Sequence, residues 1–418
     1  MRFLRILTIA GLWLAAVRAE AAEPSIGRDV TQLYAEFCSG CHGPKLEGGK
    51  GGSLVDDRWK HGGDDESIAR SIRDGRPWSG MPAFRGALEE AEVKAMVTFI
   101  RETAVRRKEP EPKEEDPLPR GVQRSQEHAF RFEVVAEGLD VPWSFAFLPD
   151  GRILATERVG RLRVIEQGRL RPEAIEGLPE VFVRDEAGLM SVVADPGYAE
   201  NGWVYLSFSD IGPGETSMTR IVRGRLRAGR FVDQEDVFAV ARECYQRSSV
   251  LFGGRLVFHG EHLFFSVGER GMEEGTTGQA QDLTAANGKI HRVRRDGSVP
   301  PDNPFVGEPG YVGSIWALGV RNPHGLAIDR RNGDLWETEH GPRGGDELNR
   351  IERGKNYGWP VVTRGMNYNG TPISEKKEVP GMEPPVIDWT PSIAVDQIEF
   401  YTGETFPKWR DHRFIGSL

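Results

Sequence analysis

The chain has 418 residues, which at roughly 100 to 200 residues per domain suggests two or three domains. Its 51 glycines and its 9% of aromatic residues favour a turn-rich β protein and exclude collagen, a coiled coil and a disordered polar chain. A net charge of −9 gives the chain no attraction to nucleic-acid phosphates or anionic lipids, so we expect no nucleic-acid partner.

Residues 1–22 have the pattern of a signal peptide. Arg2 and Arg5 precede an apolar run at 6–17, and a small-x-small cleavage pattern follows at 19–21. We therefore expect a periplasmic protein without an integral membrane domain once the signal is cleaved. The alternative is an uncleaved anchor, which the short apolar run disfavours because a membrane-spanning helix needs about 20 apolar residues.

A Cys-x-x-Cys-His motif at 38–42 follows the signal peptide. In this arrangement Cys38 and Cys41 add to the vinyl groups of a haem, and His42 ligates its iron. A zinc site would need a second Cys/His pair, and a thioredoxin-type redox pair would need a βαβ pattern, so haem c is favoured over both. The third cysteine of the sequence, Cys244, has no assigned role.

Three helices are expected around this motif. Apolar residues recur at helical spacing over 30–37 and again over 93–100, and a shorter helix at 65–74 would end at Gly75. The first of these helices would deliver Cys38 at its end. The pattern predicts a small helical haem domain at 23–105.

A haem that transfers electrons needs a sixth iron ligand, and a thioether raises its potential. Met81 is the candidate because it lies in a Gly-Met-Pro sequence, where a helix cannot form. Met96 fits better as a core residue of a helix, and His61 as a solvated residue of a glycine-rich loop, although it could also be a ligand. The segment 29–102 resembles the class I cytochromes c, which carry both the haem attachment motif and the Gly-Met-Pro loop.

Residues 106–127 separate this domain from the rest of the chain. Their first part is rich in proline, glutamate and lysine and nearly free of apolar residues, so it cannot bury a core. We interpret the segment as a semi-rigid linker that keeps the haem domain at high effective concentration beside the following domain.

Short strands replace helices from residue 128 to the end of the chain. Five strand–turn–strand units recur at irregular spacings of about 50 to 70 residues, a range typical of four-stranded propeller blades with loop insertions. The alternative is a β-sandwich, which would place its strands closer together. The units span 145–155, 192–207, 256–268, 326–338 and 398–416. An all-β propeller at 128–418 is therefore the expected fold of the second domain.

Long motifs in this second domain occur at 140–147, 253–256, 319–326, 339–347 and 356–360. Together they resemble the soluble aldose dehydrogenases that use pyrroloquinoline quinone (PQQ), and the resemblance extends from Phe132 to Leu418. It implies a six-bladed propeller with PQQ and calcium bound at the mouth of the central channel. Because the family continues beyond the position of Leu418, the resemblance also implies a truncated last blade.

The resemblance assigns residues to these cofactors. PQQ is a flat tricarboxylate that needs guanidinium and amide donors, and calcium prefers oxygen ligands, including backbone carbonyls. Glu186 and His340 stand where the family more often has Gln. The implied PQQ contacts are Glu186, Arg321, Asn322, His340 and Asp346, and the implied calcium ligands are the carbonyl groups of Gly341 and Pro342.

One position departs from the family in a way that bears on catalysis. The family's catalytic base is a His four residues before the Arg of the Gly-Arg-Leu motif, and this chain has Leu251 there. Leucine cannot accept a hydroxyl proton, and losing a positioned base costs roughly 10²- to 10⁴-fold in rate. His324 and His340 are possible substitutes, and Arg321 is the tentative catalytic residue.

These observations favour a periplasmic quinoprotein dehydrogenase. An aldose sugar or related alcohol would reduce PQQ, and the electrons would pass singly to the chain's own haem and then to a respiratory acceptor. Leu251 keeps a second interpretation open, in which a degenerate, non-catalytic propeller serves as a binding module beside an electron-transfer cytochrome. A third interpretation, a lactonase-type hydrolase, would need a metal site of carboxylates and leaves the haem unexplained.

Overall fold

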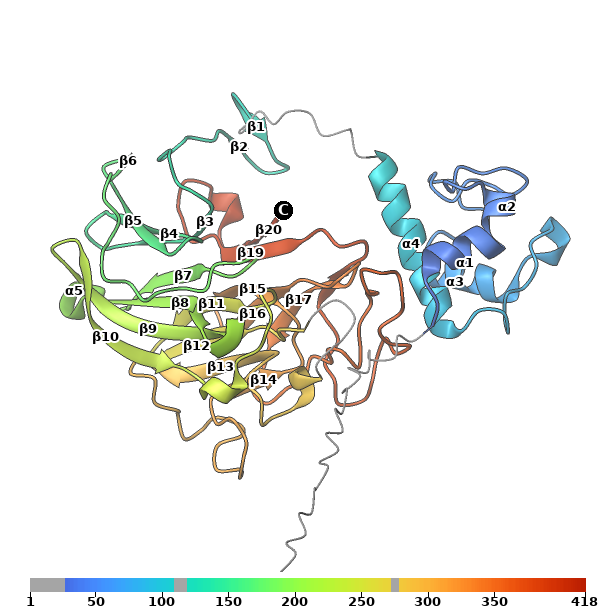
Figure 1. The fold of residues 1–418 in the computed structure, drawn as a ribbon. Helices are drawn as coiled ribbons and strands as arrows, with labels where there is room; N and C mark the ends of the chain where they lie inside the picture. Colours follow the sequence, from blue (N-terminus) through green and yellow to red (C-terminus); the bar gives the residue numbers. More distant parts are fainter. Residues whose placement is uncertain (1–26, 109–118, 272–277) are drawn as a thin grey trace, which may run out of the picture.

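The computed structural model describes residues 27–108, 119–271 and 278–418 (Figure 1). The expected signal peptide and the greater part of the proline-rich segment lie outside these ranges. Within them the chain forms a helical domain, followed by a domain built of β-sheets. In Figure 1 the helical domain lies beside the sheets, and α4 is the helix nearest to them.

The helical domain contains the three predicted helices. They are α1 (Val30–Phe37), α3 (Asp65–Asp74) and α4 (Glu90–Lys108), with the single turn α2 (Ser39–His42) and the 3-10 turn η1 (Pro77–Ser79). Asp29 caps α1 by accepting a hydrogen bond from the backbone N–H of Thr31, and Asp64 caps α3 in the same way through Ser67. The helix α4 runs past residue 105, because its last turn is basic and suits the negative end of the helix dipole.

The core of this domain lies between the three helices. Val30 and Leu33 of α1, Ile72 of α3, and Met96 and Ile100 of α4 are all buried in one apolar cluster. The cluster also contains Met366, which comes from the β domain. The core role expected for Met96 is therefore confirmed, while the contribution of the second domain was not anticipated.

The β domain contains four antiparallel sheets of four strands each, a fifth sheet of two strands, and a small hairpin at its start. The hairpin is β1 (Gln123–Arg124) and β2 (Ala129–Phe130), and the first sheet is β3 (Pro142–Phe147), β4 (Ile153–Glu157), β5 (Arg161–Glu166) and β6 (Arg169–Leu170). The second is β7 (Leu189–Ala194), β8 (Trp203–Ile211), β9 (Ser217–Arg227) and β10 (Arg230–Phe238), with the turn α5 (Tyr198–Asn201) between its first two strands. The third is β11 (Gly253–His259), β12 (His262–Val267), β13 (Lys289–Arg294) and β14 (Ile315–Leu318). The fourth is β15 (Pro323–Ile328), β16 (Leu335–Glu339), β17 (Asp346–Ile351) and β18 (Ile387–Trp389), and the fifth is β19 (Val395–Phe400) and β20 (Arg413–Ser417).

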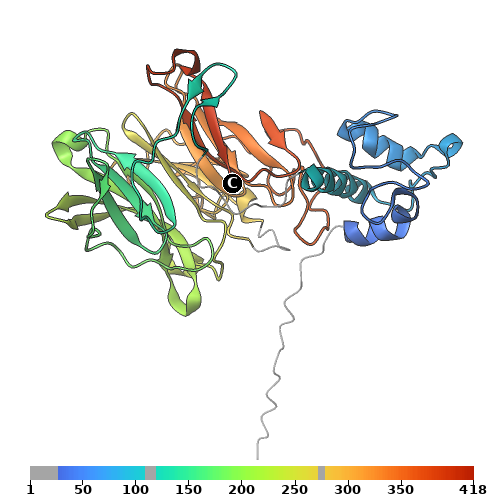
Figure 2. The ribbon, with the colours of Figure 1, turned by 90° about the horizontal axis from the view of Figure 1, so that it is seen from above.

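Each predicted strand–turn–strand unit is the first pair of strands of one sheet. The first strands contact one another in chain order, β3 with β7, β7 with β11, β11 with β15 and β15 with β19. Figure 2 shows the sheets following one another in this order, from the green to the red part of the chain. This arrangement is a β-propeller and not a sandwich. The described residues contain four complete blades and a two-stranded fifth sheet.

The core of the propeller lies between successive blades. Leu154 of the first blade and Leu206 of the second share one buried cluster, and Tyr205 and Leu263 belong to a cluster that joins the second blade to the third. Similar clusters join the third blade to the fourth and the fourth to the fifth sheet. Buried strands therefore hold the connections at the ends of the blades in fixed positions, and the candidate cofactor residues lie on those connections.

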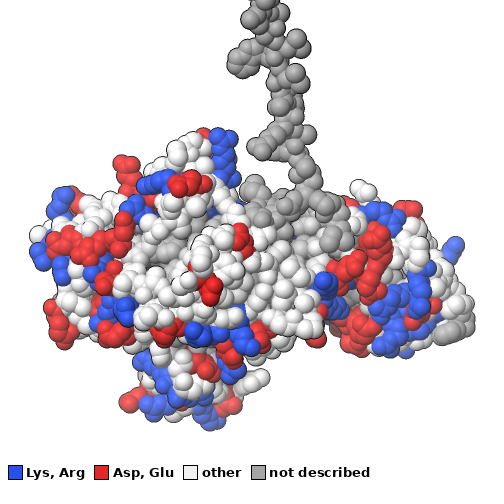
Figure 3. Space-filling view, turned by 90° about the horizontal axis from the view of Figure 1, so that it is seen from below, with Lys and Arg blue, Asp and Glu red and all other residues white. Residues whose placement is uncertain are grey.

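The surface carries both signs of charge. On the face seen in Figure 3, acidic and basic side chains are interspersed over the propeller and the helical domain. In the part of the chain that the structure describes, no helix is long and apolar enough to cross a membrane.

Candidate haem and cofactor sites

A cavity in the helical domain brings together two residues of the haem motif and the predicted sixth ligand, whereas Cys41, the other predicted haem thiol, is exposed and is not among the lining residues. Cys38, His42 and Met81 all line it, although they come from the end of α1, from α2 and from the loop after η1. His61 also lies on its wall. The other lining residues include Tyr34, Leu54, Arg58, Trp59, Lys60, Ile68, Ile72, Arg76, Met96 and Ile100.

The imidazole of His42 is oriented by the glycine-rich loop that follows it. Its Nδ1 lies 2.8 Å from the carbonyl oxygen of Gly52, which leaves Nε2 free to ligate iron. Gly51 packs against the ring so closely that an added Cβ would lie 2.8 Å from Cε1 of His42. The glycines of this loop therefore hold the ring in the orientation that an axial ligand needs.

The backbone holds Met81 beside this cavity. Arg76 and Met81 exchange two hydrogen bonds, from Arg76 N to Met81 O at 2.8 Å and from Met81 N to Arg76 O at 3.2 Å. Met96 lines the same cavity from α4, but only 1% of it is exposed and it is part of the packed core. Of the two methionines, Met81 is the one on a loop that can present its sulfur to an iron.

The cavity fits a haem chemically. Its wall is largely apolar, as a porphyrin requires, and the lining residues Arg58, Lys60 and Arg76 would supply positive charge for the two haem carboxylates. The Nε of Arg76 is buried and has no hydrogen-bond partner within the described ranges. Burial raises the pKa of the Cys38 thiol to about 11, with a smaller contribution from Cys41, so the sulfur is a neutral thiol.

On the propeller, Arg321 and Asn322 occupy the connection between β14 and β15. Glu339, at the end of β16, accepts hydrogen bonds from both of their backbone N–H groups, the one from Asn322 at 3.2 Å. Burial raises the pKa of Glu339 to about 7, although these two hydrogen bonds act in the opposite direction. The carboxyl group of Glu339 therefore fixes the backbone on which the implied PQQ contacts stand.

The guanidinium of Arg321 is nearly buried, with 6% of the residue exposed. Its Nη1 donates to the carbonyl oxygen of His340 at 2.9 Å, and its Cζ lies 5.3 Å from the ring centre of Trp359. Trp359 in turn donates its indole N–H to Glu269, whose own N–H donates to the carbonyl of Arg321 at 2.8 Å. These contacts hold Arg321 without occupying all of its donors.

Two imidazoles stack beside this arginine. The rings of His324 and His340 have their centres 4.2 Å apart at an angle of 18°. Burial, with smaller contributions from the neighbouring His324 and Arg321, lowers the pKa of His340 to about 3, so His340 is neutral. Its Nε2 is buried and has no partner among the described residues, which makes it available to a bound cofactor.

Asn322 joins this group to Gly253, the first residue of β11, and so to the loop that precedes it. Its Oδ1 accepts a hydrogen bond from Gly253 N at 3.2 Å, and its Nδ2 lies 2.9 Å from Nε2 of His324. On the other side of His324, Nδ1 lies 3.5 Å from Asp396. One hydrogen-bonded chain therefore links the Gly-Arg-Leu motif, the Arg-Asn pair and the start of β19.

Leu251 lies in the same loop, two residues before Gly253. It is 8% exposed and has a φ of 55°, in the left-handed region that few non-glycine residues adopt. Its backbone N–H donates to Oε2 of Glu186 at 2.8 Å. The structure thus places Glu186 beside the position that holds the catalytic base in the family, and neither Leu251 nor its backbone can accept a proton.

Asp346 holds the bend that contains Gly341 and Pro342. It is fully buried, and its carboxylate accepts from Gly341 N at 2.9 Å and from Ile393 N and Val395 N at 3.0 and 3.1 Å. The hydroxyl of Ser392 donates to it as well. Asp346 therefore fixes the backbone of the Gly341–Pro342 bend, which we call the cofactor bend.

The bend fits a cation that is held by carbonyl groups. Within the ranges described, no group donates a hydrogen bond to the carbonyl oxygen of Gly341 or Pro342, and both residues are buried. The same ranges contain no group of three or more His, Cys, Asp or Glu side chains placed to hold a metal ion. A calcium ion here would rely on backbone oxygens, and the carboxylate metal site of a lactonase has no counterpart in these ranges.

Four residues of this network were not singled out from the sequence. Trp359 lies inside the Asn-Tyr-Gly-Trp-Pro motif, and Glu339 directly precedes His340, so both carried a signal. Glu269 and Asp396 lie in segments without a recognisable motif. Only their burial against Arg321 and His324 reveals them.

Comparisons with known proteins match both domains. Residues 139–418 match the family model described as glucose/sorbosone dehydrogenase, and residues 27–100 match the model described as cytochrome c oxidase, cbb3-type, subunit III. The aldose sugar dehydrogenase YliI of Escherichia coli (strain K12) is 40% identical over 292 residues, which cover 68% of this chain and 77% of that protein.

Two solved structures extend this likeness. The soluble aldose sugar dehydrogenase from Escherichia coli in its apo form is 39% identical with a TM-score of 0.63, covering 68% of this chain and 82% of that chain. The PQQ-bound form of the aldose sugar dehydrogenase from Streptomyces coelicolor is 29% identical with a TM-score of 0.52, covering 64% of this chain and 73% of that chain.

Proposed function

Because the chain belongs to the glucose/sorbosone dehydrogenase family and carries a cytochrome c domain, it is an oxidoreductase, and we propose that it is a periplasmic quinoprotein that oxidises an aldose sugar or related alcohol with PQQ and calcium. The electrons pass to its own haem c and from there to a respiratory acceptor. The relative whose structure holds PQQ supports the choice of cofactor.

One observation carries this proposal. Arg321, Asn322 and His340 converge beside the Gly341–Pro342 bend, and the buried Nε2 of His340 has no partner within the described residues. A flat polycarboxylate needs this kind of donor set. The same chain carries a second cavity whose lining fits a haem.

Each residue of the cofactor cluster has a distinct part in this proposal. Arg321 and His340 bind and orient the cofactor, and Glu339 keeps the backbone of Arg321 in place. The carbonyls of Gly341 and Pro342 hold calcium, and Asp346 fixes their bend. When bound, PQQ supplies the electrophilic carbonyl that accepts the hydride. Arg321 also stabilises negative charge that develops in the reaction, which is its catalytic role.

The redox balance explains why a haem is attached. Oxidation of one alcohol group to a carbonyl releases two electrons and two protons, whereas a haem iron takes one electron as it passes from Fe³⁺ to Fe²⁺. A single haem would therefore have to pass on one electron before it could accept another, and the two protons would go to water. His42 and Met81 would hold the haem iron.

Leu251 favours a second candidate function. Without a base at this position the propeller could be a binding module that no longer turns over substrate, and the haem would then serve another electron donor. The two candidates differ in one measurable property, the reduction of the haem by a sugar.

The test uses the full-length holocytochrome, reconstituted with calcium and PQQ. We expect an aldose to reduce the haem, seen by absorbance, only when calcium, PQQ and sugar are all present. Titration of the protein with PQQ, followed by fluorescence, reports binding separately. PQQ binding without haem reduction, in a protein whose haem dithionite reduces, would support the binding module. Absence of PQQ binding would contradict the dehydrogenase and also favour the binding module.

A further inference from the structure

Three polar side chains on successive turns of α4 face away from the haem cavity, and two of them are buried while Lys94 is half-buried. Lys94, Thr98 and Glu102 are spaced four residues apart and so lie on one side of the helix. Thr98 is 3% exposed and Glu102 is 7% exposed. Met96 and Ile100, on the opposite side of α4, line the haem cavity. A polar stripe of this kind is normally solvated, so its burial calls for a specific partner.

The partner of this stripe is the propeller. The carboxylate of Glu102 and the guanidinium of Arg343 form an ion pair at 2.6 Å, with 8% and 15% of their side chains exposed. A second bond joins Nε of Arg343 to Glu102 at 3.2 Å. Lys94 donates to the carbonyl oxygens of Thr363 and Ser374, the latter at 3.3 Å. We call residues 361–374, which lie between β17 and β18, the docking loop.

Arg343 directly follows the implied calcium ligands Gly341 and Pro342 in the chain, although its side chain lies outside the cofactor cluster and pairs with Glu102. Its backbone exchanges two hydrogen bonds with Met366 of the docking loop, at 3.1 and 3.0 Å. The side chain of Met366 is buried in the core of the haem domain. Two contacts therefore tie the haem domain to the end of the cofactor bend, one through Glu102 and one through Met366.

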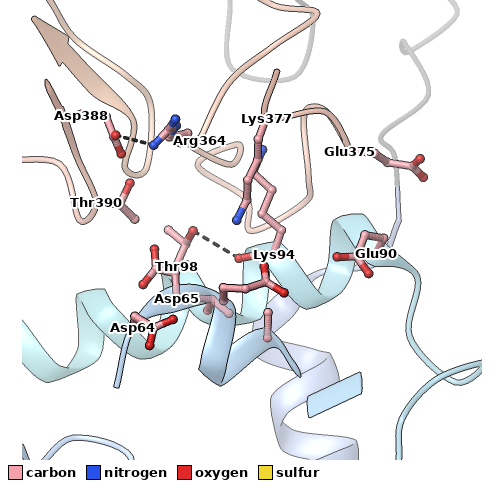
Figure 4. Close-up of a pocket in the computed structure, with 13 residues that line it drawn as sticks. Asp64, Asp65, Glu90, Lys94, Thr98, Arg364, Glu375, Lys377, Asp388 and Thr390 are labelled. Carbon is pink, nitrogen blue, oxygen red and sulfur yellow. Dashed lines mark hydrogen bonds and ion pairs between the residues drawn. The ribbon is translucent and has the colours of Figure 1, made fainter. Parts of the chain in front are cut away.

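A pocket at this junction is lined by charged side chains from both domains. Figure 4 shows Asp64, Asp65 and Glu90 on the side of the haem domain, and Arg364, Lys377, Glu375 and Asp388 on the side of the propeller. Arg364 pairs with Asp388 at 2.5 Å, so the propeller brings both signs of charge to the pocket. The specific contacts across the junction are therefore those of Lys94, Glu102 and Met366.

We propose that Glu102 and Arg343 are positioning residues that dock the haem domain on the docking loop, so that α4 alone separates the haem from the cofactor bend. This inference rests on the proposed function for its purpose, which is intramolecular electron transfer. The linker supplies only proximity, since a tether raises the local concentration without choosing an orientation. The ion pair selects the orientation in which one face of α4 contacts the propeller and the other contacts the haem.

The test compares charge reversals of the pair in the full-length holocytochrome. The variants are E102R, R343E and the double variant E102R/R343E, with E36R on the exposed surface of α1 as the matched control. Small-angle X-ray scattering without PQQ reports whether the haem domain stays docked. In the reconstituted protein, haem reduction by an aldose is compared with sugar oxidation by a soluble dye.

We expect each single reversal to enlarge the particle and to slow haem reduction by about tenfold or more, because it leaves a buried charge beside a like charge. Dye reduction by E102R should stay within about twofold, because Glu102 lies on α4 and outside the cofactor cluster. The double variant should recover the compact shape and the rate, and E36R should match the wild type.

Wild-type dimensions and haem reduction in both single variants would overturn the proposal. Failure of the double variant to recover would overturn it too, because the charges would then act through something other than their pairing. If the wild-type haem is never reduced by sugar, the proposed function fails, whereas the scattering data still decide whether the pair docks the domain.

Discussion

At the scale of single residues, the backbone of Leu251 is as informative as its side chain. Its φ of 55° suits glycine, asparagine, aspartate or histidine better than an aliphatic residue. The loop therefore keeps a conformation that a His would tolerate, next to Glu186 and two residues from Gly253, which bonds to Asn322. With Leu at position 251 the protein lacks a proton acceptor there, and the left-handed backbone of this leucine is strained.

We predict that L251H raises the rate of sugar oxidation by about 10²-fold or more, because a positioned base commonly contributes 10²- to 10⁴-fold. Steady-state turnover with a soluble dye measures this in the reconstituted protein. L251N is the control, since it relieves the same backbone strain without adding a base. Equal rates in the two variants would show that the missing base does not limit turnover.

At the scale of elements, α4 serves two domains with two faces, and Lys94 makes its outer face sensitive to pH. Burial lowers the pKa of Lys94 to about 7, with smaller contributions from Lys377 and Arg364. A released haem domain would return this amine to its ordinary pKa near 10.5. The other charged groups around it are Asp64, Asp65, Glu66, Glu90, Glu375 and Asp388.

The direction of the pH dependence of docking follows from proton linkage. Between pH 7 and about 10.5 the released state binds a proton that the docked state does not, so docking strengthens as the pH rises through this window. We predict that scattering finds a more compact average shape at pH 9 than at pH 7. In K94M the dependence should disappear, whereas K50M, which removes an exposed lysine, should keep it. An unchanged pH dependence in K94M would exclude Lys94 as its source.

At the scale of the whole molecule, the two domains share a core. Met366 belongs to the propeller, yet it is 1% exposed and packs with the residues between α1 and α4. We predict that M366A lowers the stability of the haem domain by roughly 2 to 5 kcal/mol, the usual cost of cutting a buried methionine to alanine.

Unfolding of the haem domain in denaturant, followed by the haem absorbance, measures this loss. The control is M382A, which changes a half-buried methionine of the same connection that lies near Gly358 and not in the haem domain. A haem domain equally affected by both variants, or by neither, would show that Met366 is not part of its core.

The sequence predicted what depends on local spacing. The helices at 30–37 and 65–74 and all five strand pairs are present because periodicity and turn residues determine them within a few positions. The haem motif and Met81 were found because a thiol pair, a His and a Gly-Met-Pro loop are local signals. The structure places Cys38, His42 and Met81 at one cavity, whereas Cys41 is exposed, and the roles of all four residues in binding haem stay predictions.

What the sequence could not predict depends on contacts between distant segments. Glu102 and Arg343 are 241 residues apart, and a polar stripe at 94, 98 and 102 is typical of the solvated side of an amphipathic helix. This side of α4 is buried only because the docking loop packs against it. Asp396 was missed for the same reason, since nothing around it marks the start of β19 as a neighbour of His324.

The shared methionine has a consequence for anyone who wants to reuse these domains. The boundary drawn along the chain, at the proline-rich segment, is not the boundary in space, because one side chain of the haem domain's interior is encoded more than 250 residues after that domain's last helix begins. A haem domain grafted onto another dehydrogenase would lack the Met366 side chain in its core, and the polar side chains of Lys94, Thr98 and Glu102 would be exposed to solvent. To transplant this cytochrome c domain, an engineer would need to move two separate stretches of sequence, α1 to α4 and the docking loop, as one unit.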